Sequence, residues 1–260
     1  MPPAHARRHR PPSVSAVLPA YNEEAVVAET LRRTHAALAA LELPGFEVIV
    51  VDDGSTDQTR ARSEEIASEL PGVKVVSHRK NRGYGAALRT GFEAAASAAI
   101  FVMDSDGQFD PSDLRLLLDH WSPKTVVCGC RVERRDPLIR RLNHWTFFRL
   151  VEAAYGPTAR DTNCGFKLFP RAIGQGLGFD GALVSTELLV RARIKGFEIV
   201  DIPVPHYRRL TGRPTGARPA VVVRAFGELW RLRRELRRQQ PAQPATEAPA
   251  WHAAQPSRTP

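Results

Sequence analysis

The sequence predicts an α/β fold in which helices flank a mostly parallel central sheet. Short β-branched runs alternate with segments of helical composition, most clearly through residues 14–130. This alternation is typical of βαβ units with right-handed crossovers. The chain has 260 residues, 43% of them hydrophobic, which is enough for one sizeable domain with its own core.

The strands are predicted from short apolar runs rich in β-branched residues, such as EVIVV at residues 47–51. In chain order the strands cover residues 14–18, 47–51, 73–77, 100–103, 125–130 and 198–203.

The helices are predicted from composition, apolar period and punctuation. Pro71 and Gly72 end the helix that precedes them, and Pro111 opens another. In chain order the helices cover residues 23–41, 57–70, 85–98, 111–120, 136–154, 184–195 and 221–238.

The net charge of +9 is concentrated at the two ends of the chain. Three arginines lie within residues 1–12, and ten lie within residues 207–240. The body between them has no basic excess, so we expect no nucleic-acid partner. We expect a disordered basic N-terminus at residues 1–12, one domain at 13–220, an amphipathic basic helix at 221–238 and a disordered tail at 239–260.

The three cysteines, Cys128, Cys130 and Cys164, form no disulfide framework and are expected to be core thiols in a reducing compartment. No run reaches the ~18 apolar residues that a membrane span needs. The basic N-terminus lacks the apolar segment of a secretion signal. We therefore expect a cytoplasmic protein.

Three polar clusters follow three of the predicted strands. They are PAYNEE at residues 19–24, DDGSTD at 52–57 and DSDGQ at 104–108. Ligands of open α/β sheets bind beyond the carboxyl ends of the strands. We therefore expect the three clusters to meet at one edge of the sheet, although they are far apart in the sequence.

The third cluster predicts a divalent cation site. Asp104 and Asp106 lie two positions apart, so in extended chain their carboxylates face the same way. They can share Mg²⁺ or Mn²⁺, with Gln108 as a neutral contact and Gly107 allowing the turn. The alternative is a turn that caps the helix at Pro111, which explains Asp110 but not the two aspartates before it.

The other clusters predict the contacts of a nucleotide. Asp52 and Asp53 can accept hydrogen bonds from a base and a ribose, whereas Ser55 or Thr56 is expected to cap the next helix. Glu24 is equally explained by its place in the first turn of a helix. The residues expected to surround the nucleobase are Pro19, Ala20 and Tyr21, with Glu23 nearby.

The segment RGYGAALR at residues 82–89 follows the third predicted strand. Arg82 and Gly83 stand at a helix start, where exposed backbone N–H groups suit an anion. The third glycine of the dinucleotide fingerprint is missing, because Leu88 stands there, so a nicotinamide enzyme is not expected.

These motifs together resemble the nucleotide-sugar half of family 2 inverting glycosyltransferases, which have the GT-A fold. The segments that resemble this family are LPAYNEE, VVDDGSTDQT, NRGYGAALRTGF and DSDGQF. RDTNCGFKLFP, residues 160–170, resembles the stretch found in dolichyl- or polyprenyl-phosphate mannosyl- and glucosyltransferases. The resemblance covers residues 13–216. Asn163 stands where glutamine is common, and GRPT at 212–215 lacks the usual lysine.

The resemblance implies a role for several residues. Asp52 and Asp53 would contact the nucleoside. Asp104, Ser105, Asp106 and Gln108 would hold the diphosphate and its metal. Arg131 would lie near the acceptor phosphate, and Arg209 would belong to a basic loop that closes over the site.

The implied reaction moves a hexose, mannose or glucose, from a UDP or GDP sugar to a polyprenyl phosphate with inversion. A phosphate acceptor needs no general base, because its second pKa is near ~6. The alternative keeps the donor but uses a hydroxyl acceptor, with Glu187 as general base. A third interpretation is a nucleotide-sugar-binding protein without activity.

The basic helix at residues 221–238 has two interpretations. Its apolar stripe could lie on an anionic membrane surface, which would place the protein peripherally on the inner face of the membrane, alone or with a membrane-protein partner. Alternatively, the stripe packs on the domain and the arginines face water.

Overall fold

The computed structural model describes residues 12–131, 152, 156, 158–181, 183–207 and 234. Glu152 and Arg234 are helical, but the rest of the helices expected at 136–154 and 221–238 lies outside the described residues, as do the two terminal segments and Arg209. The domain boundaries at these ends therefore remain predictions.

A seven-stranded sheet forms the centre of the molecule, with strand order β3-β2-β1-β4-β6-β5-β7. Its strands are β1 Val14–Ala20, β2 Phe46–Asp52, β3 Val73–Ser77, β4 Ala99–Met103, β5 Thr125–Arg131, β6 Phe166–Pro170 and β7 Glu198–Val204. All neighbouring pairs are parallel except those of β6, which runs antiparallel to both β4 and β5. The mostly parallel sheet is confirmed, and β6 is a strand that the sequence pattern did not predict.

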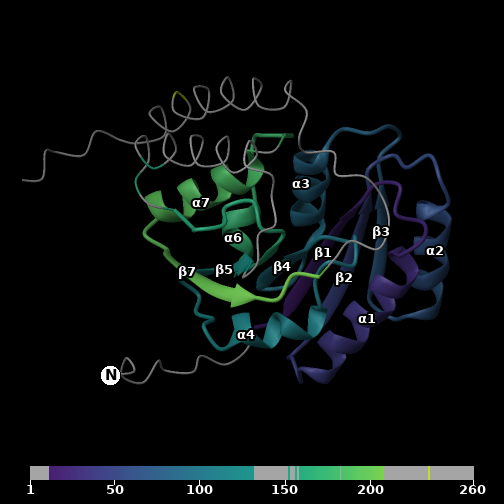
Figure 1. Cartoon of the computed structure of the whole chain (residues 1–260), viewed down its shortest axis with the longest axis horizontal. Helices are drawn as coiled ribbons and strands as arrows, with labels where there is room; N and C mark the ends of the chain where they lie inside the picture. The colour runs from purple at the N-terminus through teal and green to yellow at the C-terminus, as the bar shows by residue number, and fades with distance from the viewer. Residues whose placement is uncertain are drawn as a thin grey trace, which may run out of the picture.

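Helices cover both faces of the sheet (Figure 1). They are α1 Val27–Ala40, α2 Thr59–Glu69, α3 Tyr84–Ala94, the 3-10 turn η1 Pro111–Asp113, α4 Leu114–Leu118, α6 Arg171–Gly174 and α7 Val184–Ile194. Helices α1, α2 and α4 pack on one face, and α3, α6 and α7 pack on the other. The buried β-branched and aromatic residues of the strands fill both cores, and Phe101 and Phe166 make an edge-on ring contact at 4.9 Å.

Helix α3 ends four residues earlier than the sequence predicts, because the backbone beyond it bonds to side chains at the start of the sheet. Ala96 N donates to Glu47 Oε1 (2.7 Å), Ser97 N to Ser15 Oγ (3.0 Å) and Ala98 N to Ser13 Oγ (3.0 Å). These bonds replace the helical ladder and lead the chain directly into β4.

The turn before α4 forms as the sequence predicts. Asp110 Oδ1 accepts from Ser112 N at 3.0 Å, with Pro111 at the first position of η1. The helical stretch begins with a 3-10 turn and ends at Leu118 rather than at residue 120.

Two of the three cysteines, Cys128 and Cys164, are buried in the core, and Cys130 is half-buried. Across the described ranges, no helix has the length and the apolar character that crossing a membrane demands.

Candidate functional site

The polar clusters that follow β1, β2 and β4 meet at one edge of the sheet. Because these strands are parallel, their carboxyl ends point the same way. Asp53 N donates to Ala20 O at 2.9 Å, and Ser105 Oγ donates to Pro19 O at 2.7 Å. The predicted convergence of the clusters is confirmed.

Asn22 joins the cluster after β1 to the cluster after β2. Its N–H donates to Ser55 Oγ (3.0 Å), and its Oδ1 accepts from Thr56 N (2.9 Å). Asn22 has a φ of 55°, a conformation that asparagine tolerates better than most residues. The sequence pattern gave no role to Asn22.

The prediction that Ser55 or Thr56 caps α2 is wrong. Ser55 and Thr56 bond Asn22, and it is Asp57 Oδ1 that accepts from Thr59 N at the start of α2 (2.9 Å). The carboxylate of Glu24 also serves α2, since it accepts from Gln58 N at 2.9 Å. Glu24 is therefore not in the first turn of α1, which begins only at Val27.

Asp53 organises the loop that precedes α3. Its buried carboxylate accepts from Arg82 N (2.9 Å) and Gly83 N (2.8 Å). It also accepts from His78 Nδ1 (2.6 Å), whose other ring nitrogen lies 2.9 Å from Thr90 Oγ1. Charged acceptors of this kind hold a turn strongly. His78 is a site residue that sequence reasoning missed, because it lies just beyond a strand and outside the quoted motifs.

Asp52 is equally buried and lies beside Asp53 at the end of β2. Its Oδ1 accepts from Ser55 N at 3.1 Å, which closes the turn after the strand. Tyr21, at the start of the neighbouring loop, is 41% exposed.

Asp104 and Asp106 lie together beside the loop before α3. Tyr84 Oη donates to Asp104 Oδ1 at 2.9 Å, and Gln108 N donates to Asp106 Oδ1 at 3.1 Å. Gly107 between them has a φ of 73°, as the predicted turn requires.

Burial raises the pKa of Asp104 to about 6, and the nearby charge of Asp106 adds to this effect. Tyr84, Lys167 and Arg131 act in the opposite direction. Burial, together with the Asp104 carboxylate, raises the pKa of Tyr84 well above its ordinary value, so the phenol keeps its proton and remains the donor.

The pair Asp104 and Asp106 fits a divalent cation that is shared with a ligand. Two close carboxylates leave negative charge that a hard cation neutralises. Within the described part of the chain, however, no three His, Cys, Asp or Glu side chains form a metal-binding group. Gln108 Nε2 donates to Tyr207 O at 3.0 Å, so only its amide oxygen could face a metal. A bound cation would therefore take further oxygens from phosphate.

Arg131, at the carboxyl end of β5, is held by Asp161. Nε lies 2.7 Å from Asp161 Oδ2, and a terminal nitrogen lies 3.0 Å from Oδ1. Asp161 is buried, whereas the Arg131 side chain is 23% exposed. Burial alone would lower the pKa of Arg131, but the hydrogen bonds and charge of the Asp161 carboxylate raise it, so Arg131 stays charged. Asp161 therefore orients this arginine.

Antiparallel β6 explains how RDTNCGFKLFP reaches the site. Because β6 runs against its neighbours, the segment before it lies at the edge where the other strands end. Cys164 N donates to Asp161 O (3.0 Å), and Asp104 N donates to Gly165 O (3.2 Å). This segment therefore connects the Arg131 side of the site to the Asp104 side.

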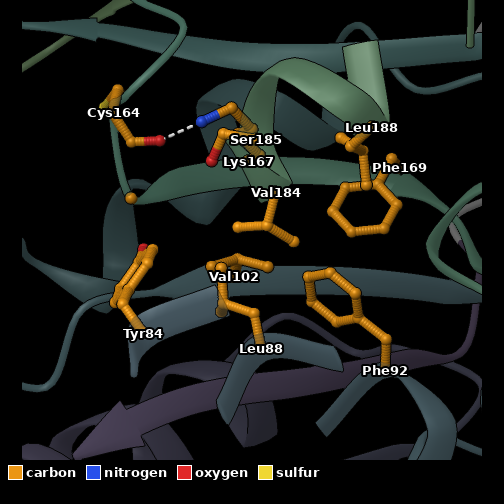
Figure 2. Close-up of a pocket in the computed structure, with 11 residues that line it drawn as sticks. Tyr84, Leu88, Phe92, Val102, Cys164, Lys167, Phe169, Val184, Ser185 and Leu188 are labelled. Atoms are coloured by element: carbon orange, nitrogen blue, oxygen red, sulfur yellow. Dashed lines mark hydrogen bonds between the residues drawn. The ribbon is translucent and has the colours of Figure 1, made fainter. Parts of the chain in front are cut away.

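A small pocket opens beside Asp104, between α3, β4, β6 and α7 (Figure 2). Tyr84, Cys164, Lys167 and Ser185 form one end of the pocket, and Phe92, Phe169 and Leu188 form the other. Lys167 is 3% exposed, and its Nζ donates to Cys164 O. Lys167 was also missed, since it lies in the strand that the pattern did not predict.

Glu187 is fully buried on α7. Its carboxylate accepts from Gly178 N (2.9 Å) and Phe179 N (3.1 Å) and forms an ion pair with Arg191 (2.7 Å). These partners make it a structural carboxylate. The alternative that uses it as a general base is not favoured.

The family model of glycosyl transferase family 2 matches residues 15–180, more than half of the chain. The chain belongs to glycosyl transferase family 2. The matched residues contain the clusters after β1, β2 and β4, the Arg82 loop and the Arg131–Asp161 pair.

Curated relatives extend the comparison. The chain is 37% identical over 164 residues to an undecaprenyl-phosphate 4-deoxy-4-formamido-L-arabinose transferase of Pseudomonas aeruginosa, covering 62% of this chain and 48% of the relative. A transferase with the same description from Klebsiella pneumoniae is 33% identical over 206 residues, covering 76% of this chain and 61% of the relative. The chain thus spans about half to three fifths of these relatives.

Solved structures share the fold. Glucosyl-3-phosphoglycerate synthase from Mycobacterium tuberculosis with UDP has a TM-score of 0.66 at 23% identity, over 85% of this chain and 80% of that one. A mannosyltransferase from Pyrobaculum calidifontis with GDP-mannose and Mn²⁺ has a TM-score of 0.61 at 21% identity, over 85% and 65%. The expected GT-A fold is confirmed.

Proposed function

We propose that this chain transfers a sugar from a nucleoside diphosphate sugar to a polyprenyl phosphate, with inversion at the anomeric carbon. The observation that carries the proposal is the hydrogen-bonded edge at which Asp53, the Arg82–Gly83 loop, Tyr84 and Asp104 meet. The curated relatives act on undecaprenyl phosphate, which supports a lipid phosphate acceptor.

On the donor side, the loops after β1 and β2 hold the nucleoside. Tyr21 presents an exposed ring for the base, and Asp52 lies at the end of β2 for the ribose. Asp53 keeps the Arg82 loop in place from beneath. Because Asp53 already accepts from the N–H groups of Arg82 and Gly83, the exposed Arg82 side chain would face the diphosphate.

Asp104 and Asp106 would hold Mg²⁺ or Mn²⁺ against the diphosphate, with the amide oxygen of Gln108 beside them. When bound, the cation neutralises the charge that develops on the leaving nucleoside diphosphate. Solved structures of two proteins with the same fold contain Mn²⁺, which supports a divalent cation without deciding between the two metals.

On the acceptor side, Arg131 would hold the lipid phosphate. Asp161 holds two of its nitrogens, and the Arg131 side chain is 23% exposed, so its other N–H groups would be offered to the phosphate. A phosphate oxygen attacks the anomeric carbon, the new C–O bond forms on the opposite face, and the bond to the β-phosphate oxygen breaks. The acceptor is already ionised near neutral pH, since its second pKa is about 6.

A transfer assay tests this proposal. The full chain is incubated with Mn²⁺, undecaprenyl phosphate in detergent and one labelled donor at a time: UDP-glucose, GDP-mannose or a nucleotide-activated 4-deoxy-4-formamido-L-arabinose. We expect one donor to give a labelled lipid that depends on both the acceptor and Mn²⁺. Transfer to saccharide hydroxyls with none to the lipid would contradict the proposal.

The place of the protein in the cell also belongs to this proposal. The lipid acceptor requires access to a membrane surface, and the basic helix expected at residues 221–238 would supply it. Binding to anionic vesicles that weakens with salt, and that is lost when residues 221–260 are deleted, is the expected outcome. Unchanged partitioning of the shortened chain would contradict it.

A further inference from the structure

The Asp104 carboxylate is enclosed by two elements that are distant in the sequence. On one side is Tyr84, the first residue of α3. On the other is Gly165, in the segment that leads into β6. The proposed reaction needs Asp104 as a ligand but assigns no part to either neighbour.

Tyr84 contacts Asp104 through its hydroxyl group. The Oη–Oδ1 distance is 2.9 Å, and the phenol donates. Two hydrogen bonds restrain the start of α3, because Asp53 accepts from the N–H groups of Arg82 and Gly83 directly before it. The Tyr84 residue is 40% exposed, whereas its hydroxyl group is buried against Asp104. Figure 2 shows its ring on the side of the pocket opposite Phe92 and Phe169, with the oxygen at the end of the ring nearer Cys164.

Gly165 contacts the same carboxylate from the β6 side. Asp104 N donates to Gly165 O at 3.2 Å, so the two backbones run side by side. A Cβ atom on Gly165 would overlap the Oδ2, Cγ and Oδ1 atoms of Asp104. Any larger residue there would displace the carboxylate.

A third contact holds the turn at Cys164 and Gly165 in place. Lys167 is buried in β6, and its Nζ donates to the carbonyl of Cys164, the residue before Gly165. The turn that supports Asp104 is therefore tied to the strand that follows it.

We propose that Tyr84 and Gly165 are positioning residues that orient the Asp104 carboxylate for a divalent cation. The inference rests on the proposed function, because it assumes that Asp104 binds a cation. Hydrogen-bonded partners of metal-binding carboxylates fix ligand orientation, and their loss typically lowers metal affinity or activity about 10–100-fold.

The test measures Mn²⁺ affinity of the full chain by electron paramagnetic resonance, with and without UDP. Tyr84→Phe removes only the hydroxyl group, and we expect the Mn²⁺ dissociation constant to rise at least about tenfold. Gly165→Ala should raise it by a similar factor through the opposite side of the carboxylate. Tyr207→Phe is the matched control, since Tyr207 is an exposed tyrosine whose backbone alone bonds Gln108, and its affinity should equal that of the wild type.

A double-variant cycle separates positioning from a general effect on the fold. In the Asp104→Asn background, Tyr84→Phe should change the residual Mn²⁺ affinity little, because the group that it orients is gone. Equal effects in both backgrounds would overturn the inference.

The remaining outcomes distinguish the positioning role of Tyr84 and Gly165 from the proposed metal site itself. If Asp104→Asn abolishes Mn²⁺ binding but Tyr84→Phe and Gly165→Ala bind as the wild type does, the inference is wrong and the proposed metal site stands. If the wild type binds no Mn²⁺ with or without UDP, both the metal site and the inference are wrong.

Discussion

At the scale of single residues, the acidic side chains of this edge differ in what already bonds their oxygens. Asp53 accepts from two backbone N–H groups and from His78, so it holds a loop. Asp104 accepts from Tyr84 and lies near the charge of Asp106, and it is the carboxylate that we propose as a ligand of a divalent cation. The shared residue type hides two different roles.

Replacing Asp53 with Asn tests the first role. The amide nitrogen would face N–H groups, and a buried donor without an acceptor costs about 1–3 kcal/mol. We expect the free energy of unfolding to fall by about that amount and the affinity for nucleoside diphosphate to fall as the Arg82 loop loosens. Urea unfolding and calorimetric titration measure the two effects. Asp119→Asn, at an exposed position, is the control.

Replacing Glu187 with Gln tests whether this carboxylate is structural. Arg191 would lose its buried partner, so the free energy of unfolding should fall by about 3 kcal/mol. The rate of sugar transfer to the lipid phosphate should stay close to that of the wild type at a temperature where the variant is folded. A variant of unchanged stability that loses about a hundredfold in rate would instead identify a general base.

At the scale of elements, tertiary hydrogen bonds decide where helices begin and end. The sequence pattern predicted α1 from residue 23, but Glu23 N and Glu24 N donate to Thr59 and Asp57, and the helix begins at Val27. Such long-range partners leave no local signal in the sequence. Strand β6 was not predicted because the charged Lys167, which is buried in the fold, interrupts its short apolar run.

Glu47 is the clearest case of a side chain that fixes an element end. It accepts from Ser15 Oγ (2.6 Å), Lys74 Nζ (2.7 Å) and Ala96 N (2.7 Å). Burial alone would raise its pKa, but the bonds from Lys74, Ser15 and Ala96 outweigh this and lower the pKa below its ordinary value of 4.5.

The lowered pKa of Glu47 predicts a pH dependence of stability. The stabilisation is fully present above the unfolded-state pKa and is lost as the pH falls through the lower folded-state pKa. The free energy of unfolding of the wild type should therefore exceed that of Glu47→Gln near neutral pH, and the gap should close in acid below about pH 4.5. Chemical unfolding at a series of pH values measures the gap, and a constant gap would refute this account.

At the scale of the whole molecule, the sequence predicted that the polar clusters meet at one edge of the sheet, but not the hydrogen bonds that join them. Parallel strands place the polar clusters that follow them at one edge, so the meeting of the clusters near Asp52 and Asp104 followed from the predicted parallel direction of the strands. The links through Asn22, His78 and Gly165 depend on loop conformation, which the pattern does not encode.

The segment before β6 joins the two halves of the site, and this predicts a selective effect for Asp161→Asn. The variant weakens the hold on Arg131, so the KM for polyprenyl phosphate should rise while Mn²⁺-dependent binding of the nucleoside diphosphate is unchanged. Steady-state kinetics and calorimetry on the same protein test this. A loss of donor binding with an unchanged acceptor KM would reverse the assignment of the two sides.

Loops from separate strands build one site, and we propose that Asp104 and Asp106 in it bind a divalent cation together with the diphosphate of the donor. The most direct measurement is calorimetric titration of the full chain with UDP and with GDP, in Mn²⁺ or in excess chelator, beside the Asp104→Ala, Asp106→Ala double variant. We predict saturable binding of one of the two nucleotides in Mn²⁺, which disappears in chelator and in the double variant. Equal binding in all of these conditions would contradict the account.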